Sequence, residues 1–216
     1  MRGMIGLFGK LNYLIIKHIR ENSIYYLGFI IMFSIGLSLG AYWVSNLNTE
    51  TRDLLSRYIN GFFSLIPINE LDNLSIFKAS FINNIAALTL LLILGLTYAG
   101  VVFSPLFMIF KGFCFGFSVA FLVEGFGRKG LIFSIVSLLP HSIISIPATI
   151  FICVASLQYS LYILKNRKEK RYESKRQSFI NYLFSFMFGA VLIMLSSLIE
   201  SYITPIFIKG ISPFII

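Results

Sequence analysis

The sequence predicts an all-α protein, a polytopic bundle of membrane helices that crosses the bilayer five times. Of its 216 residues, 57% are hydrophobic and only 12% are charged, whereas soluble domains carry roughly 25% charged residues. A soluble domain of this length has too small an interior to bury such an apolar excess. The apolar residues also gather in runs of about 20, the length of a helix that spans a bilayer. Runs such as 88–96 lack the period-two alternation of a membrane β-barrel, so the crossings are predicted to be helices.

Five runs qualify as crossings, and the whole chain is predicted to form one integral membrane domain. The fourth run is too long for one straight crossing, because it would extend for about 50 Å against a hydrocarbon core of about 30 Å. It contains Pro140 and Pro147, and proline removes a backbone donor and clashes with the preceding turn. We therefore expect a broken or strongly kinked element that still crosses once. In chain order the five runs are 24–44, 81–103, 106–123, 131–164 and 179–203.

The amino-terminal arm, residues 1–23, combines basic and apolar residues at helical spacing. Lys10, Lys17 and Arg20 alternate with leucines and isoleucines, which is typical of a helix that lies on an anionic membrane surface. A simple basic tail that only orients the first crossing is an equally good interpretation. The run that follows is longer than the apolar stretch of a cleaved signal peptide, so it is predicted to be an uncleaved anchor.

The charge distribution predicts the orientation of the bundle. The segment from Lys165 to Arg176 holds seven Lys or Arg in twelve residues, and short loops rich in Lys and Arg stay in the cytoplasm. If the arm, the basic loop 165–178 and Lys111 lie inside, they carry the whole net charge of +9, and the charges outside cancel. The sequence thus predicts a cell-membrane protein with a cytoplasmic amino terminus and an external carboxyl terminus. The positive charge is assigned to membrane orientation, and no nucleic-acid partner is expected.

The segment 45–80 is predicted to be the only sizeable loop outside the membrane, and it contains an amphipathic helix. Its apolar residues recur at helical spacing and form one face. One interpretation is that this face lies on the outer leaflet or covers the bundle. The other is that it binds an extracytoplasmic partner, and the candidate contact residues are then Leu55, Tyr58, Ile59 and Phe62.

Two GxxxG spacings occur within the crossings, Gly36 with Gly40 and Gly112 with Gly116. Glycines four residues apart share a helix face and allow a neighbouring backbone to approach closely. Packing between helices of one chain is the simpler interpretation. Association of two copies as a homo-oligomer is the alternative.

Few ionisable residues fall within the crossings. His141 lies between Pro140 and Pro147, where a structural role in binding carbonyls freed by the prolines is favoured over proton transfer. Glu200 is expected near the outer end of its helix, close to water. The sequence contains no recognisable catalytic motif, and Cys114 and Cys153 do not form a CxxC pair. No catalytic residue, metal site or cofactor is therefore predicted.

The segment from Lys111 to Ile150 resembles the stage II sporulation protein M family. It reads Lys-Gly-Phe-Cys-Phe-Gly-Phe-Ser from Lys111, and later Leu-Leu-Pro-His-Ser-Ile-Ile-Ser-Ile-Pro-Ala. Ser-Leu-Ile-Glu-Ser-Tyr-Ile-Thr-Pro at 197–205 is also similar, as are the basic arm and the five-run layout. Many relatives carry a glycine and an acidic residue where this chain has Ser142 and Ser145, which weakens any role for an acidic group there.

The resemblance implies a membrane protein of engulfment in an endospore-forming bacterium, located in the mother-cell or septal membrane. Its partners would be stage II sporulation proteins D and P, a lytic transglycosylase and an amidase/endopeptidase that cut peptidoglycan. A non-enzymatic scaffold that recruits these hydrolases is the leading hypothesis. A small-solute transporter or channel is the alternative, because discontinuous helices often build binding sites at the centre of the membrane.

Overall fold

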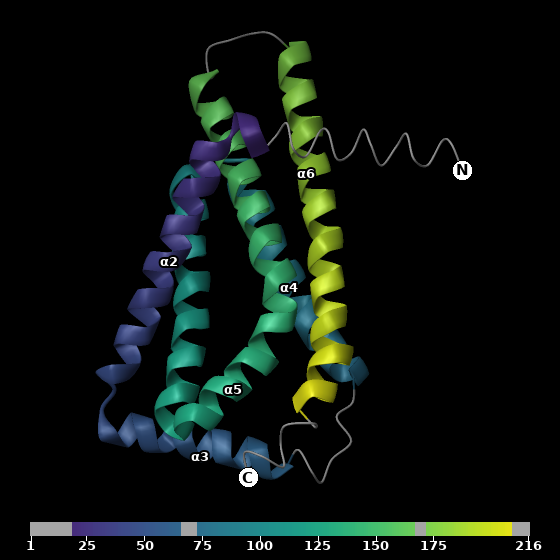
Figure 1. Ribbon diagram of the computed structural model, residues 1–216. Helices are drawn as coiled ribbons and strands as arrows, with labels where there is room; N and C mark the ends of the chain where they lie inside the picture. Colours follow the sequence, from purple (N-terminus) through teal and green to yellow (C-terminus); the bar gives the residue numbers. More distant parts are fainter. Residues whose placement is uncertain (1–18, 66–72, 167–171, 209–216) are drawn as a thin grey trace.

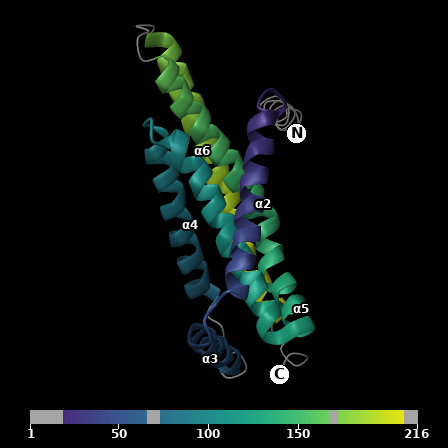
Figure 2. The same ribbon diagram turned by 90° about the vertical axis from the view of Figure 1, so that its left-hand side faces the viewer.

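The computed structural model describes residues 19–65, 73–166 and 172–208, and every element within these ranges is helical. The helices are α2 (Ser23–Ser45), α3 (Thr49–Leu65), α4 (Asn73–Gly95), α5 (Gly100–Lys165) and α6 (Tyr172–Leu198), and α6 continues into a π-helical turn, η1 (Ile199–Ile203). Figure 1 shows α3 lying across one end of the long helices, and Figure 2 shows the same arrangement from the side.

Four helices in the described part are long and apolar enough to cross a membrane, namely Ser23–Ser45, Leu74–Gly95, Gly100–Lys165 and Lys175–Ile208. Their outward faces remain apolar: Ile143, Phe184 and Met187 are 68%, 67% and 69% exposed. A soluble monomer rarely exposes apolar surface on this scale. The prediction of an all-α membrane bundle is therefore confirmed at the level of fold class.

The longest helix, α5, reverses direction near its middle (Figure 1). Its 66 residues would extend for about 100 Å if they were straight, but Gly127 has φ 59° and ψ −131°, outside the helical region. Residues with a Cβ rarely adopt such a conformation, which glycine adopts at little cost. The reversal lies in the interval between the third and fourth runs of the sequence analysis.

The expected break at Pro140 and Pro147 is wrong, because α5 stays helical through both prolines. The chain bends between Gly127 and Lys165 but is not interrupted there (Figure 1). A proline within a membrane helix is tolerated when neighbouring helices and hydroxyl groups satisfy the backbone around it. Here Ser196 of α6 donates a hydrogen bond to the carbonyl of His141 at 2.9 Å.

The second run, 81–103, is also placed differently, because α4 begins at Asn73 and ends at Gly95. The last carbonyls of a helix lack hydrogen-bond donors within the helix, and here side chains of other helices and the following turn donate to them. Leu92 accepts from the Tyr182 hydroxyl at 2.8 Å, and Gly95 accepts from the Ser160 hydroxyl at 2.9 Å. Thr97 caps Leu94 with its backbone N–H and its hydroxyl. The helix therefore ends inside an apolar run. It also begins within the predicted outer segment 45–80, so residues 73–80 belong to α4.

Helices α2 and α5 pack with their backbones in contact through both GxxxG pairs. A methyl group at Gly36 would overlap the carbonyl oxygen of Ile109, and one at Gly112 would overlap that of Phe33. Gly40 and Gly116 are equally close to carbonyls of the opposite helix. The two motifs thus face each other within one chain, which leaves neither available to a second copy.

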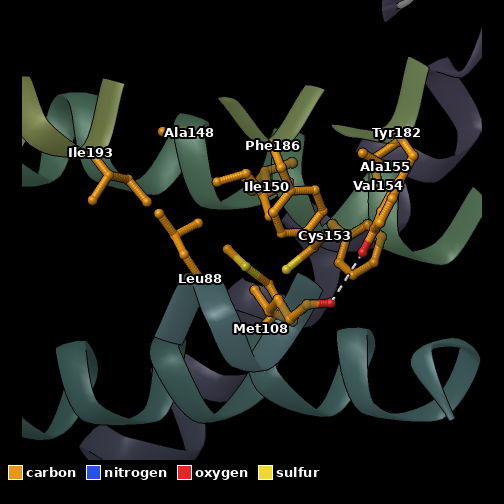
Figure 3. Packing of buried hydrophobic residues seen from close by; sticks show 13 residues of the cluster. Leu88, Met108, Ala148, Ile150, Cys153, Val154, Ala155, Tyr182, Phe186 and Ile193 are labelled. Carbon is orange, nitrogen blue, oxygen red and sulfur yellow. Dashed lines mark hydrogen bonds between the residues drawn. The ribbon is translucent and has the colours of Figure 1, made fainter. Parts of the chain in front are cut away.

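The apolar core lies where α4, α5 and α6 meet (Figure 3). Leu91, Met108 and Ile152 are at most 1% exposed and form a dry layer across the bundle. The side chains of Tyr182 and Phe186 enter this core from α6, with their rings 4.7 Å apart. Packing in this core fixes the positions of the three helices relative to one another along the bundle axis. It thereby also fixes the positions of the polar groups that these helices carry.

Candidate functional site

Polar side chains from three neighbouring helices form two hydrogen-bonded clusters on either side of one small cavity. We call this group the polar seam; it consists of Ser80, Asn84, Lys111, Thr149, Ser197 and Glu200. Ser80 with Asn84, and Ser197 with Glu200, are separated by four and three residues, so each pair shares one helix face. The seam therefore runs along the interface of α4 with α6 and reaches α5.

Glu200 lies at one end of the polar seam, in the π-helical turn η1. Its carboxylate accepts a hydrogen bond from the Ser80 hydroxyl at 2.5 Å. Ser80 also lies 3.1 Å from the Ser197 hydroxyl, and the Asn84 amide donates to Ser197 at 3.2 Å. The expectation that Glu200 would be near water is thus only partly met, because the residue is half-buried and bonded to α4.

Lys111 lies at the other end of the polar seam. Its ammonium group donates to the Thr149 hydroxyl at 2.6 Å, and Thr149 in turn donates to the carbonyl of Ser145 at 2.7 Å. The sequence analysis assigned Lys111 to the cytoplasmic side, and the structure corrects this. Because α5 begins at Gly100 and not near residue 106, Lys111 lies three turns inside the helix and not at its end.

A small cavity of about 10 Å³ separates the two halves of the polar seam, and Asn84, Lys111 and Thr149 line it. This volume is close to the minimum that one water molecule needs. The two halves of the seam are therefore near neighbours, although no direct hydrogen bond between Asn84 and Lys111 is formed in the described structure.

Three ionisable groups interact electrostatically in this part of the bundle: Lys111 and His141 on α5, and Glu200 on η1. Lys111 and Glu200 have opposite charges, and the nearby His141 is buried at its Nδ1 atom. Charges within a membrane are costly and persist when they face the bundle interior and find partners. The seam meets this condition, since a hydroxyl binds each of the two charged groups.

The His141 ring does not make the contacts that the sequence analysis expected. Its Nδ1 is buried and forms no hydrogen bond within the described part of the chain. Its Nε2 lies 3.5 Å from the Ser142 hydroxyl, the neighbouring residue. The ring borders a pocket of about 200 Å³ that Lys111 and Ser145 also line.

The polar seam is suited to holding helices together rather than to bond cleavage. It offers a cation, a carboxylate, an amide and hydroxyls, but no nucleophile paired with a general base. Among the described residues, no three His, Cys, Asp or Glu side chains gather where they could hold a metal ion. Cys153 is fully buried and Cys114 is exposed, and both are free thiols.

The candidate partner-binding residues lie on α3, at the end of the bundle farthest from the basic loop (Figure 1). Leu55 is half-buried, and the neighbouring Leu54 is 60% exposed. The side chains of Tyr58, Ile59 and Phe62 lie outside the described residues. An ion pair of 2.6 Å between Arg52 of α3 and Glu124 of α5 holds the start of this helix against the bundle.

Sequence reasoning identified Glu200 and His141 but missed Ser80, Asn84 and Thr149 as members of one site. Hydroxyl and amide side chains in apolar runs commonly bond their own helix, and Thr89 does so here. The available signal was the pair Asn83-Asn84 in an otherwise apolar run. Its significance depends on which helix packs against it.

The fold and the polar seam together define a polytopic helical membrane protein whose interior charges are tied to neighbouring helices. The family model for stage II sporulation protein M matches residues 29–205, which include all four of the long helices in whole or in part. The chain therefore belongs to the stage II sporulation protein M family, and its predicted resemblance is confirmed. Neither a curated protein nor a solved structure matches the chain. Membership of this family implies a membrane protein of sporulation.

Proposed function

We propose that this protein is a non-enzymatic scaffold that recruits and positions peptidoglycan-degrading enzymes at the septal or engulfing membrane during endospore formation. The partners would be hydrolases similar to stage II sporulation proteins D and P. The family assignment supports the cellular process. The observation that carries the scaffold role is α3, an amphipathic helix held across one end of the bundle by the Arg52–Glu124 ion pair.

The scaffold requires α3 to face the cell wall, and this follows from five crossings. The reversal of α5 at Gly127 supports counting its two halves as separate crossings, in addition to α2, α4 and α6. The start of α2 and the basic connection between α5 and α6 lie at the same end of the bundle, opposite α3 (Figure 1). Since short segments rich in Lys and Arg stay in the cytoplasm, α3 and the carboxyl terminus lie outside.

The docking surface on α3 is the apolar face that includes Leu55, Tyr58, Ile59 and Phe62. The first turn of the helix is linked to α5 by the ion pair of Arg52 with Glu124, which connects the apolar face to the bundle. Leu54, on the neighbouring position of this face, is 60% exposed. Large apolar side chains exposed on an ordered helix favour contact with a partner or with the membrane surface.

Charged substitutions on this face distinguish the partner from the membrane. We expect Leu55→Asp, Tyr58→Asp, Ile59→Asp and Phe62→Asp, singly and combined, to abolish hydrolase co-purification and to stop engulfment while the protein stays in the membrane. Thr51→Asp is the matched control, because Thr51 is an exposed residue of the same helix and receives the same charge. Intact recruitment in the combined variant would show that the hydrolases bind elsewhere.

The transport alternative has one observation in its favour, the polar seam inside the bundle. The dry layer of Leu91, Met108 and Ile152 counts against it, because these apolar side chains are at most 1% exposed in the interior of the bundle. Flux of small solutes or protons into proteoliposomes tests it directly. Uptake above that of protein-free vesicles, lost in Lys111→Met, would favour transport over the scaffold.

A further inference from the structure

Two adjoining cavities lie between α5 and α6, on the opposite side of the dry layer from the polar seam. Their volumes are about 240 and 210 Å³, and Tyr159 and Tyr162 line both. Most of their lining residues come from the last turns of α5 and the first half of α6, and the end of α5 and the start of α6 lie at the end of the bundle opposite α3 (Figure 1). We call the two cavities together the tyrosine pocket. Neither the family assignment nor the proposed scaffold gives this pocket a role.

The walls of the tyrosine pocket are held in place by stacked rings. Tyr159 stacks on Tyr182 with ring centroids 4.5 Å apart and planes 14° from parallel. The Tyr182 hydroxyl is fixed in turn by its 2.8 Å hydrogen bond to the carbonyl of Leu92. Tyrosine is enriched where a membrane helix meets the headgroup region, because its ring is apolar and its hydroxyl is polar. The pocket is thus preformed and is placed at the depth of the headgroups.

The polar groups of the tyrosine pocket favour an anion. Gln158, Asn166 and Asn181 contribute amide side chains, and Lys175 contributes an ammonium group. No acidic residue is among the described residues that line either cavity. Lys165, adjacent in the chain to the lining residue Asn166, adds positive charge. A phosphate group accepts hydrogen bonds from the amides, and its negative charge is balanced by the ammonium group of Lys175. A ligand with a quaternary or primary ammonium group would find no carboxylate in the pocket to pair with.

The surroundings of the pocket favour a phosphate that carries acyl chains. Phe179 has its ring 6.2 Å from that of Tyr159 and is 37% exposed, and Leu164 is 52% exposed. An apolar surface therefore continues directly from the polar pocket along the outside of α5 and α6. Each cavity is also smaller than the 300–1,000 Å³ of pockets that enclose a drug-sized ligand, so a compact headgroup fits better than a large metabolite.

We propose that the tyrosine pocket binds the phosphate of an anionic phospholipid, with its acyl chains lying along Phe179 and Leu164. Lys175 pairs with the phosphate, and the amides of Gln158, Asn166 and Asn181 donate hydrogen bonds to the phosphate and the headgroup. Pockets between membrane helices that combine basic and polar donors are suited to such headgroups. The bound lipid would add a further link between α5 and α6 beside the contacts of Tyr159 with Phe179 and Tyr182.

The test is native mass spectrometry of the full chain released from detergent, titrated with phosphatidylglycerol or with phosphatidylcholine. We expect one phosphatidylglycerol to remain bound under conditions that remove phosphatidylcholine. Lys175→Gln should weaken retention roughly tenfold, because it removes the charged donor. Tyr159→Leu should weaken it as well by removing the wall that both cavities share. Thermal unfolding of each variant without added lipid checks that the fold is retained.

Arg176→Gln is the matched control, because it removes the same charge from the neighbouring residue, which does not line the pocket. It should change retention less than twofold. Equal losses in Lys175→Gln and Arg176→Gln would mean that lipids gather by diffuse attraction to the basic end, and the pocket would be rejected. Displacement of phosphatidylglycerol by millimolar glycerol phosphate or inorganic phosphate would assign the site to a soluble anion and overturn the lipid proposal. None of these outcomes depends on hydrolase recruitment by α3.

Discussion

At the scale of single residues, Lys111 and Glu200 are the most consequential charges in the bundle. They come from segments far apart in the sequence. Glu200 is bonded to a hydroxyl of α4, and Lys111 is bonded to a hydroxyl in the other half of α5. Their opposite charges reduce the cost of keeping either one away from water. Removing both partners should therefore harm the fold less than the two separate removals would suggest when added together.

A double-mutant cycle tests this coupling. We expect Lys111→Met and Glu200→Gln each to lower the free energy of unfolding by about 1–3 kcal/mol, since each leaves a desolvated polar partner. The double variant should lose less than the sum of the two single losses, because the two sites interact. Thermal unfolding in detergent measures all three proteins. Lys78→Met, at an exposed position of α4, is the control, and strictly additive losses would rule out the coupling.

The sequence identified the charged residues of the seam more readily than their partners. A lysine or glutamate in an apolar run is conspicuous, so Lys111 and Glu200 were both noticed. The depth of Lys111 was misjudged, because the apolar run gave no sign that a new helix starts at Gly100. The end of α4 just before it is capped by the hydroxyls of Ser160 and Tyr182, which reach Gly95 and Leu92 only in the folded bundle.

At the scale of helices, the pairing of α2 with α5 depends on four glycines in two facing motifs. Such an interface is held by dispersion contacts between backbones, since lipid provides no hydrophobic drive to bring two apolar helices together. Even one methyl group must therefore displace a helix from its neighbour.

Alanine substitutions test the close packing of α2 on α5. Gly36→Ala should reduce the free energy of unfolding by about 1–3 kcal/mol, because the new methyl overlaps the Ile109 carbonyl and cannot be absorbed by a flexible side chain. Gly28→Ala is the control in the same helix, since nothing lies within 4 Å of the added methyl. Urea or thermal unfolding of the two variants in one detergent measures the difference. Equal stability of both would mean that α2 is not packed as closely as described.

Helix boundaries were predicted less well than helix existence. The sequence located apolar runs from composition, and helices occupy all of them in the described part of the chain except residues 96–99, which form the turn between α4 and α5. It misplaced the end of α4, because side chains of other helices cap its last carbonyls. Such capping gives no signal in the local sequence around residue 95. It also overestimated Pro140 and Pro147, which lie inside α5 without interrupting it; prolines are tolerated in membrane helices that neighbouring helices support.

At the scale of the whole molecule, the two ends of the bundle differ in character. One end holds the basic connection and the tyrosine pocket, and the other holds α3 and the Arg52–Glu124 ion pair. Composition was sufficient to predict a membrane bundle, because no soluble core could bury so many apolar side chains. The orientation of the two ends across the membrane was predicted from Lys and Arg alone. The tyrosine pocket could be recognised only from the folded structure.

Labelling of single cysteines with a membrane-impermeant maleimide tests the proposed orientation. In a chain whose Cys114 and Cys153 are replaced by alanine, we expect Glu50→Cys on α3 to react in intact cells. Lys175→Cys should react only after the cells are permeabilised, because it lies at the basic end that stays inside. Lys78→Cys, near the start of α4, is a second external position. Reaction of Lys175→Cys in intact cells would invert the topology and place α3 in the cytoplasm.

In the proposed five-crossing topology, the turn at Gly127 governs how this chain enters the membrane as it is synthesised. The two halves of α5 are joined by one glycine turn, so we expect them to enter the lipid together as a hairpin whose tip carries Arg128 and Lys129. Lys111 would then be in the bilayer before Glu200 is translated. The nascent bundle would hold an uncompensated cation until its last helix arrives, so we expect completion of the chain to close the fold.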